Sequence, residues 1–182
     1  MKRIFIYTIS GILLLVSCKK NEPQKQYDEK ETAVKIEENL KVSIDVIIHE
    51  DDNFHLYYTE DGTIEFDEER SIWASVSGSK NVQEITFTLP ENVYPTNLRI
   101  DFGYGKNENQ SDVTLQSFKI AYLDNIFEVE NTDIFNYFYP NQDNTVVIPN
   151  TATLQRKDKS QNTAPIIYPL PQLTEVLNKI IE

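Results

Sequence analysis

The chain has 182 residues, of which 17 are basic and 29 acidic, giving a formal net charge of −12. A surface this acidic repels nucleic acid and anionic lipid head groups, which excludes both as expected direct ligands. The single cysteine excludes an internal disulfide, so nine Phe and ten Tyr must supply much of the packing.

The first eighteen residues begin with two basic residues and continue with an uninterrupted run of low charge from Ile4 to Val16. At about 1.5 Å per residue, this run is too short to cross a hydrocarbon core of roughly 30 Å. The pattern therefore predicts a secretory signal peptide over residues 1–17 rather than a membrane-spanning helix.

The segment Leu15-Val16-Ser17-Cys18 resembles the lipobox of bacterial lipoproteins. The resemblance implies cleavage before Cys18, a diacylglyceryl group on its sulfur and an acyl chain such as palmitate on the new amino terminus. Two or three such chains anchor a protein firmly, because each buried methylene contributes about 0.8 kcal/mol. Lysine rather than aspartate follows Cys18, so by the same resemblance we expect an outer-membrane lipoprotein, in either leaflet. The alternative is an ordinary secretory signal.

Polar and charged residues follow the cysteine as far as about Lys35. With almost no large apolar side chain, this stretch is typical of a flexible tether, which we place over residues 18–35. The remaining residues, 36–182, suit one domain with a sizeable core.

Alternation of apolar and polar residues then predicts a series of half-buried strands. These strands cover residues 40–48, 71–76, 82–89, 98–102, 113–122 and 125–129, with shorter candidates at 146–148 and 152–154. In the segment 113–122, the apolar residues change phase between Leu115 and Phe118. One extra residue near Gln116 or Ser117 would restore the alignment, which predicts a β-bulge there.

Two other local signals stand out along the chain. Asp61-Gly62 separates the runs 54–58 and 63–66, and this dipeptide predicts a β-hairpin with a type I′ turn. The aromatic segment 133–140, which ends in proline, suggests one helical turn.

The last segment switches to helical spacing, with Pro171 suited to the first turn. The apolar positions are Leu173, Val176, Leu177, Ile180 and Ile181. So short a helix is marginal alone, so we expect its apolar face to pack on its own domain, with a partner protein as the alternative.

Many short strands without alternating helices predict an all-β antiparallel sandwich of the jelly-roll or immunoglobulin-like type, with a short C-terminal helix. Within residues 82–122, an Arg99-x-Asp101 strand ends in glycine and precedes the strand Val113-x-Leu115-x-x-Phe118. This run resembles the core strands of jelly-roll domains of the carbohydrate-binding or galactose-binding-like kind. The resemblance implies a fold more than a ligand.

Catalytic signatures are absent from the sequence, which has no Gly-x-Ser-x-Gly, Walker or His-Glu-x-x-His motif. His49 and His55 flank the acidic turn 50–52, where a metal site can be imagined. One turn rarely gathers enough ligands, so a solvated acidic loop is the better interpretation, and we expect neither metal nor cofactor. Carboxylates are numerous, yet the sequence does not place two of them across a cleft.

The aromatic residues are more informative, because sugars present C–H faces that stack on aromatic rings while amides and carboxylates bond the hydroxyls. Residues that offer this combination are Trp73, Tyr104 with Asn107 and Asn109, and Tyr137, Tyr139 and Asn141. The alternative for Trp73 is a place in the core.

The sequence therefore predicts a lipid-anchored, non-catalytic binding protein of the cell envelope, with carbohydrate recognition or an accessory role as its most concrete form. Its partners would be the membrane, through the lipid on Cys18, and a glycan or an envelope protein. The first alternative is an assembly subunit that docks through the C-terminal helix or an exposed sheet edge. The second is a hydrolase.

Overall fold

The computed structural model describes residues 39–104, 109–158 and 162–182, which belong to a compact unit spanning Lys35–Glu182. The predicted signal peptide, Cys18, the tether and Asn107 lie outside the described residues. Among the residues that are described, no helix is long and apolar enough to cross a membrane.

The described residues form two antiparallel sheets, as the alternating sequence predicts. The first sheet, hereafter sheet A, has the order β4-β1-β6-β10-β9, and β7 also pairs with β6. Its strands are β4 (Ser79–Thr88), β1 (Lys41–Ile48), β6 (Val113–Tyr122), β10 (Thr153–Arg156), β9 (Thr145–Val147) and β7 (Asn125–Glu130).

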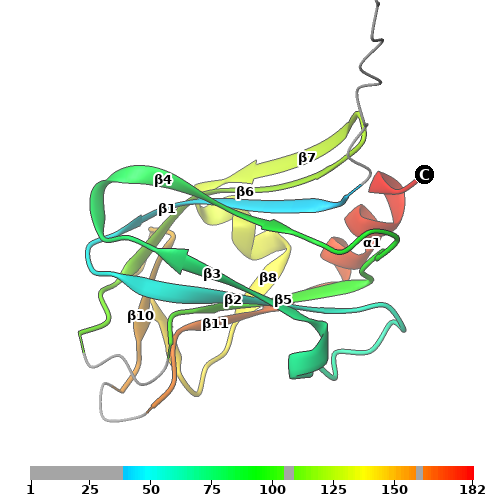
Figure 1. Ribbon diagram of the computed structural model, residues 1–182. Coiled ribbons are helices and arrows are strands. Elements are labelled where there is room, and N and C mark those ends of the chain that lie inside the picture. Colours follow the sequence, from blue (N-terminus) through cyan, green and yellow to red (C-terminus); the bar gives the residue numbers. More distant parts are fainter. Residues whose placement is uncertain (1–38, 105–108, 159–161) are drawn as a thin grey trace, which may run out of the picture. The chain divides into compact units, whose positions relative to one another are not determined.

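The second sheet, hereafter sheet B, has the order β3-β2-β5-β11-β8. Its strands are β3 (Ser71–Val76), β2 (Asp52–Thr59), β5 (Asn97–Phe102), β11 (Ile166–Pro169) and β8 (Phe138–Pro140). Figure 1 shows sheets A and B as two stacked layers, which confirms the predicted all-β sandwich.

The space between the sheets is filled by the apolar residues of the alternating pattern. Val42, Ile44 and Val46 of β1 and Ile100 and Phe102 of β5 are at most 1% exposed. Aromatic rings form edge-to-face pairs in the core, with Phe54 and Phe102 within sheet B and Phe118 of sheet A against Phe138 of sheet B. Such pairs contribute about 0.5–1.5 kcal/mol each beyond the area they bury, which fits a chain without disulfides.

The predicted β-bulge is confirmed in β6. Asp45 lies opposite Ser117 while the next residue, Val46, lies opposite Leu115, so Gln116 is the extra residue. The bulge also divides one edge of β6 between two partners. β10 pairs with Val113 and Thr114, and β7 pairs with residues 117–122.

The predicted hairpin at Asp61-Gly62 is wrong. β2 pairs instead with β3, with Tyr57 opposite Ser71, and the intervening chain contains the 3₁₀ helix η1 (Glu68–Arg70). Gly62 has φ 79°, but Asp61 is not left-handed, as a type I′ turn requires. The Asp61 carboxylate instead accepts hydrogen bonds from the backbone N–H and hydroxyl of Thr63, forming an Asx turn that starts a loop.

The C-terminal helix α1 (Pro171–Ile180) is confirmed, with Pro171 in its first turn. Leu173, Leu177 and Ile180 are buried in the core, so the helix packs on its own domain, at one end of the two layers in Figure 1. The aromatic segment before Pro140 begins as the 3₁₀ helix η2 (Asn131–Asn136) and ends as strand β8.

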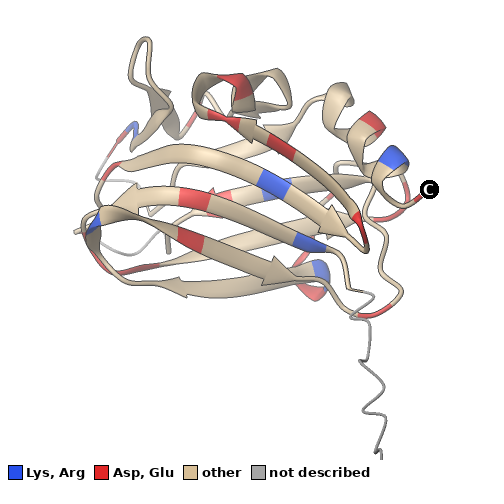
Figure 2. Ribbon diagram, turned by 90° about the horizontal axis from the view of Figure 1, so that it is seen from above, with Lys and Arg blue, Asp and Glu red and all other residues tan. Residues whose placement is uncertain are grey.

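The outer faces of the two sheets differ in chemistry. Charged residues of both signs are spread over the strands of sheet A in Figure 2. Its outer face holds cross-strand polar contacts such as Lys119 Nζ to Glu84 Oε2 at 3.0 Å and the hydroxyl pair of Ser43 and Thr86 at 2.8 Å. Sheet B instead turns aromatic rings outward, and the candidate site lies there.

Candidate functional site

The outer face of sheet B brings together side chains from all five of its strands. Phe54, Leu56 and Ile100 point into the core, so the alternate residues of β2 and β5 point outward. Register places Trp73 opposite His55, His55 opposite Asp101, Tyr57 opposite Arg99, and Tyr168 opposite Tyr139. We call these residues the aromatic face: Trp73, His55, Tyr57, Arg99, Asp101, Tyr168 and Tyr139.

The centre of the aromatic face is a stacked ion pair. Arg99 donates from Nε and Nη2 to the two carboxylate oxygens of Asp101, at 2.8 and 2.6 Å. The guanidinium carbon lies 4.7 Å from the ring centroid of Tyr57 and 5.2 Å from that of Tyr168. Bidentate pairing and stacking on two rings hold this planar group in place. Tyr168 in turn stacks on Tyr139, with centroids 5.7 Å apart.

The segment that follows β2 covers part of this centre. Tyr57 donates its hydroxyl to Glu68 of η1 at 2.8 Å, and the ring of Phe66 lies 6.1 Å from that of Tyr168. Burial, reinforced by the bond to Glu68, raises the pKa of Tyr57, so the phenol stays a donor. Burial also raises the pKa of the Asp101 carboxyl, and the guanidinium of Arg99 opposes that effect.

His55 is a buried imidazole that supports the indole of Trp73. His55 is only 1% exposed. Its ring stacks on the indole of Trp73, with the ring centroids 3.7 Å apart and an interplanar angle of 19°. Nε2 lies 3.8 Å from Glu68 Oε2, beyond hydrogen-bond distance, and has no partner among the described residues. Burial lowers the pKa of His55 to about 4, so the ring is neutral near pH 7.

Two exposed aromatic rings meet at the β3 end of the face. Trp73 is 50% exposed and Tyr104 is 47% exposed, and their centroids lie 6.2 Å apart at an angle of 66°. Together with Asn53 they line a hollow of about 270 Å³. A second hollow of about 460 Å³ shares Asn53 and Tyr104, and its other lining residues are Asp51, Asp52, Ser75, Val76 and Ser77.

Tyr104 is held in this place by a buried polar cluster. Asp52 accepts the backbone N–H of Tyr104 at 2.7 Å, and Gln110 donates to the carbonyl of Phe102 at 2.6 Å. Between them, Gly103 has φ 137°, and a Cβ there would collide with Gln110 Nε2. Only glycine fits this conformation and this close approach.

The expectation of a fully solvated acidic turn is therefore wrong in part. Glu50 and Asp51 are exposed, but Asp52 is only 6% exposed, because it binds the Tyr104 loop. Among the described residues, no group of three or more His, Cys, Asp or Glu side chains could hold a metal ion. Beside the aromatic face, the Asp51 carboxylate accepts the N–H of Gly78 at 2.7 Å.

The structure brings some of the sequence-predicted site residues together and separates others. Trp73 and Tyr104 are neighbours, and the alternative that placed Trp73 in the core is wrong. Tyr139 is exposed on the same face, at its β8 end. Tyr137 instead packs on Phe127, with centroids 4.9 Å apart, on the side of α1.

Two of the predicted asparagines lie within the described residues. The side chain of Asn141 accepts the backbone N–H of Asp143, which closes a turn, and Asn109 is an exposed loop residue. Neither is among the residues that line the two hollows beside Tyr104.

Sequence reasoning missed the residues that form the centre of the aromatic face: His55, Tyr57, Arg99, Asp101 and Tyr168. Alternation did place Arg99 and Asp101 on the polar side of their strand. Strand order places these outward residues beside the aromatic residues of β2 and β11. No local sequence pattern contains that order.

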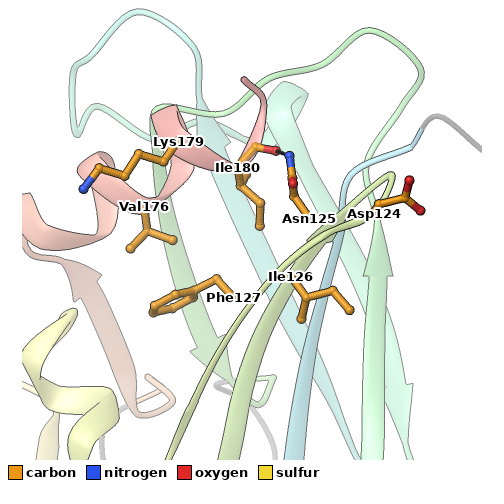
Figure 3. Close-up of a pocket in the computed structure, with 7 residues that line it drawn as sticks. All are labelled: Asp124, Asn125, Ile126, Phe127, Val176, Lys179 and Ile180. Carbon is orange, nitrogen blue, oxygen red and sulfur yellow. Dashed lines mark hydrogen bonds between the residues drawn. The ribbon is translucent and has the colours of Figure 1, made fainter.

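A second surface feature is a groove of about 470 Å³ between β7 and α1. Figure 3 shows Val176 of the helix facing the ring of Phe127 across it, with Lys179 at one side. Asn125 donates to the carbonyl of Ile180 at 2.9 Å and ties the strand to the helix. Ile126, which also lines the groove, is 68% exposed.

Comparisons with protein-family models, with curated proteins and with solved structures give no match to this chain.

Proposed function

We propose that this chain is a lipid-anchored cell-envelope protein that binds carbohydrate, without catalysis, through the aromatic face of sheet B. The observation that carries the proposal is the pair of exposed rings, Trp73 and Tyr104, beside a hollow lined by the amide of Asn53. Contiguous exposed apolar patches mark binding surfaces, and aromatic residues are enriched in such surfaces.

The chemistry of the β3 end of the aromatic face suits a sugar ring. The C–H face of a pyranose stacks on an indole or phenol, and its hydroxyls bond amides, hydroxyls and carboxylates. The stack on His55 holds Trp73 in one orientation, so little rotamer freedom is lost on binding. Arg99 and Tyr139 extend the face across sheet B for further sugar units.

The test is a glycan array probed with the full chain and with two variants, Trp73→Ala and Tyr104→Ala. Each variant should lose at least about tenfold in affinity, as expected for the central aromatic residue of a binding site. Tyr94→Ala is the matched control, because Tyr94 is also exposed but pairs with Tyr122 away from sheet B's outer face. If the full chain binds no glycan, the proposal is wrong.

The anchor is a separate part of the proposal and rests on the lipobox resemblance of Leu15-Val16-Ser17-Cys18. Cys18→Ala should abolish labelling of the chain by a fatty-acid probe in cells. Persistent labelling of that variant would exclude Cys18 as the modified residue.

A second candidate function, an assembly subunit, is favoured by the groove beside Ile126. Of the predicted apolar face of α1, Leu173 and Leu177 are buried in the domain, whereas Val176 lines the groove. Exposed Leu123 and Ile126 at the tip of the β6–β7 hairpin are the alternative contact. Ile126→Asp should then remove a crosslinked complex from envelope preparations, whereas Val82→Asp, an exposed site on β4, should leave it in place.

A further inference from the structure

The two hollows beside Tyr104 form one composite surface with an apolar side and a polar side. The apolar side is made by Trp73 and Tyr104, and the polar side by Asn53, Ser75 and Asp51. Ser75 donates its hydroxyl to the Asn53 amide oxygen at 2.8 Å, which orients the amide. A ligand that rests on the rings therefore reaches oriented polar groups at its edge.

Trp73 offers one ring face to such a ligand. Its other face is covered by His55, with the two rings 3.7 Å apart and nearly parallel. The indole is nevertheless 50% exposed, so the exposed surface is the outward face and edge. A flat platform of this kind suits the C–H face of a single sugar ring.

Among the described residues, the charged side chains that line the composite surface are all acidic. Glu50, Asp51 and Asp52 lie in sequence beside it, and Asp51 and Asp52 line the polar hollow. Two described arginines come near this end of sheet B, but each is engaged. Arg99 is bound to Asp101, and Arg156 donates to Gln110 at 2.9 Å.

From this geometry, and resting on the proposed function, we propose that the composite surface binds an uncharged sugar and rejects saccharides that carry a carboxylate at the bound ring. A ligand carboxylate about 4 Å from one of these side chains would weaken binding by about sixfold even at the dielectric constant of water. An uncharged hydroxymethyl group at the same position meets no such penalty.

The experiment uses two matched pairs of oligosaccharides that differ only in a carboxylate at C6: oligomers of mannan with those of polymannuronate, and oligomers of cellulose with their 6-carboxylates. Affinities are measured for the full chain at low and at high salt. We expect the neutral member of the best-binding pair to bind about sixfold more tightly at low salt, with a smaller ratio at high salt.

Asp51→Asn tests the cause, because the amide keeps an oxygen that can accept the N–H of Gly78 while the charge is lost. The ratio of neutral to acidic affinity should fall in this variant. It should stay unchanged in Asp45→Asn, where the carboxylate lies on sheet A and accepts the hydroxyl of Ser117.

The outcomes separate the inference from the proposal on which it rests. If the acidic member of a pair binds as tightly as the neutral one, the inference is overturned and carbohydrate binding stands. The inference is also overturned if Asp51→Asn leaves the ratio of neutral to acidic affinity unchanged. If no glycan binds at all, both the proposed function and the inference are wrong.

Discussion

Gly103 and His55 are the residues on which the exposed end of the aromatic face depends, although neither is a polar contact for a ligand. Gly103 lets the chain pass between Asp52 and Gln110 and so places Tyr104 beside Trp73. His55 lies beneath Trp73 and fixes the plane of the indole. Both residues act by positioning a neighbouring ring, so a substitution at either one is tested by its effect on the free energy of unfolding.

Gly103→Ala should destabilise the domain by about 2–3 kcal/mol, because it adds a left-handed backbone penalty to a collision with the Asp52 and Gln110 side chains. Gly62→Ala is the control. Gly62 also has positive φ, but a Cβ there meets nothing within 4 Å, so only about 1 kcal/mol should be lost. Urea unfolding of the three proteins measures the difference, and equal losses would contradict the predicted collision.

The pKa of His55 predicts a pH dependence of stability. Burial lowers this pKa to about 4, from 6.5 when unfolded, so the unfolded chain binds the proton more readily between these values. The stability that neutral His55 provides is therefore complete above pH 6.5 and is lost as the pH falls towards 4. The loss is at most about 3 kcal/mol.

His55→Phe keeps a ring under Trp73 but removes the proton. The charged groups that face His55 are Glu68, Arg99 and its cross-strand neighbour Asp101, and all three remain in this variant. The free energy of unfolding of the native protein should fall relative to that of His55→Phe between pH 7 and pH 4, as measured by urea titration. A constant difference across this range would show that His55 titrates normally.

At the scale of elements, the strands and the helix follow from local periodicity, whereas their partners do not. The alternation in β1, β5 and β6 predicts which residues are buried, and the change of phase locates the bulge at Gln116. The Asp61-Gly62 signal failed because the Asp61 side chain bonds Thr63 and the carbonyl of Thr63 accepts from Thr59 and Asn97. Those tertiary contacts outweigh a turn propensity.

The packing of α1 on its own domain predicts a large effect of truncating its buried face. Leu177→Ala should lower the free energy of unfolding by about 2–5 kcal/mol, because Leu177 is fully buried and the core would retain a cavity. Asn178→Ala, at the next and exposed position, should change it by less than about 0.5 kcal/mol. If the two variants are equally stable, the helix contributes no core packing.

At the scale of the whole sandwich, the two outer faces divide the surface into a charged side and an aromatic side. Sheet A exposes salt bridges and hydroxyl pairs, as between Lys119 and Glu84. Sheet B exposes rings at both ends and an ion pair at its centre. A ligand that stacks on aromatic rings is therefore expected on sheet B.

The chain contains a single tryptophan, which makes this expectation measurable without a label. Binding of a neutral oligosaccharide should shift the fluorescence of Trp73 to shorter wavelength and reduce its quenching by iodide, because the exposed indole face is covered. Tyr94→Ala should show the same change. Binding without any change in Trp73 fluorescence would place the ligand elsewhere on the protein.

The sequence by itself determined the all-β class, most of the buried residues, the bulge and the C-terminal helix, because each depends on periodicity within one segment. The candidate site was partly foreseen through Trp73, Tyr104 and Tyr139, since exposed aromatics suit a binding role in any β fold. Only the tertiary structure decided that Trp73 is exposed and that Tyr104 lies beside it. The reason is strand order: it places residues from β2, β5 and β11 on one surface, and no spacing along the chain contains that information.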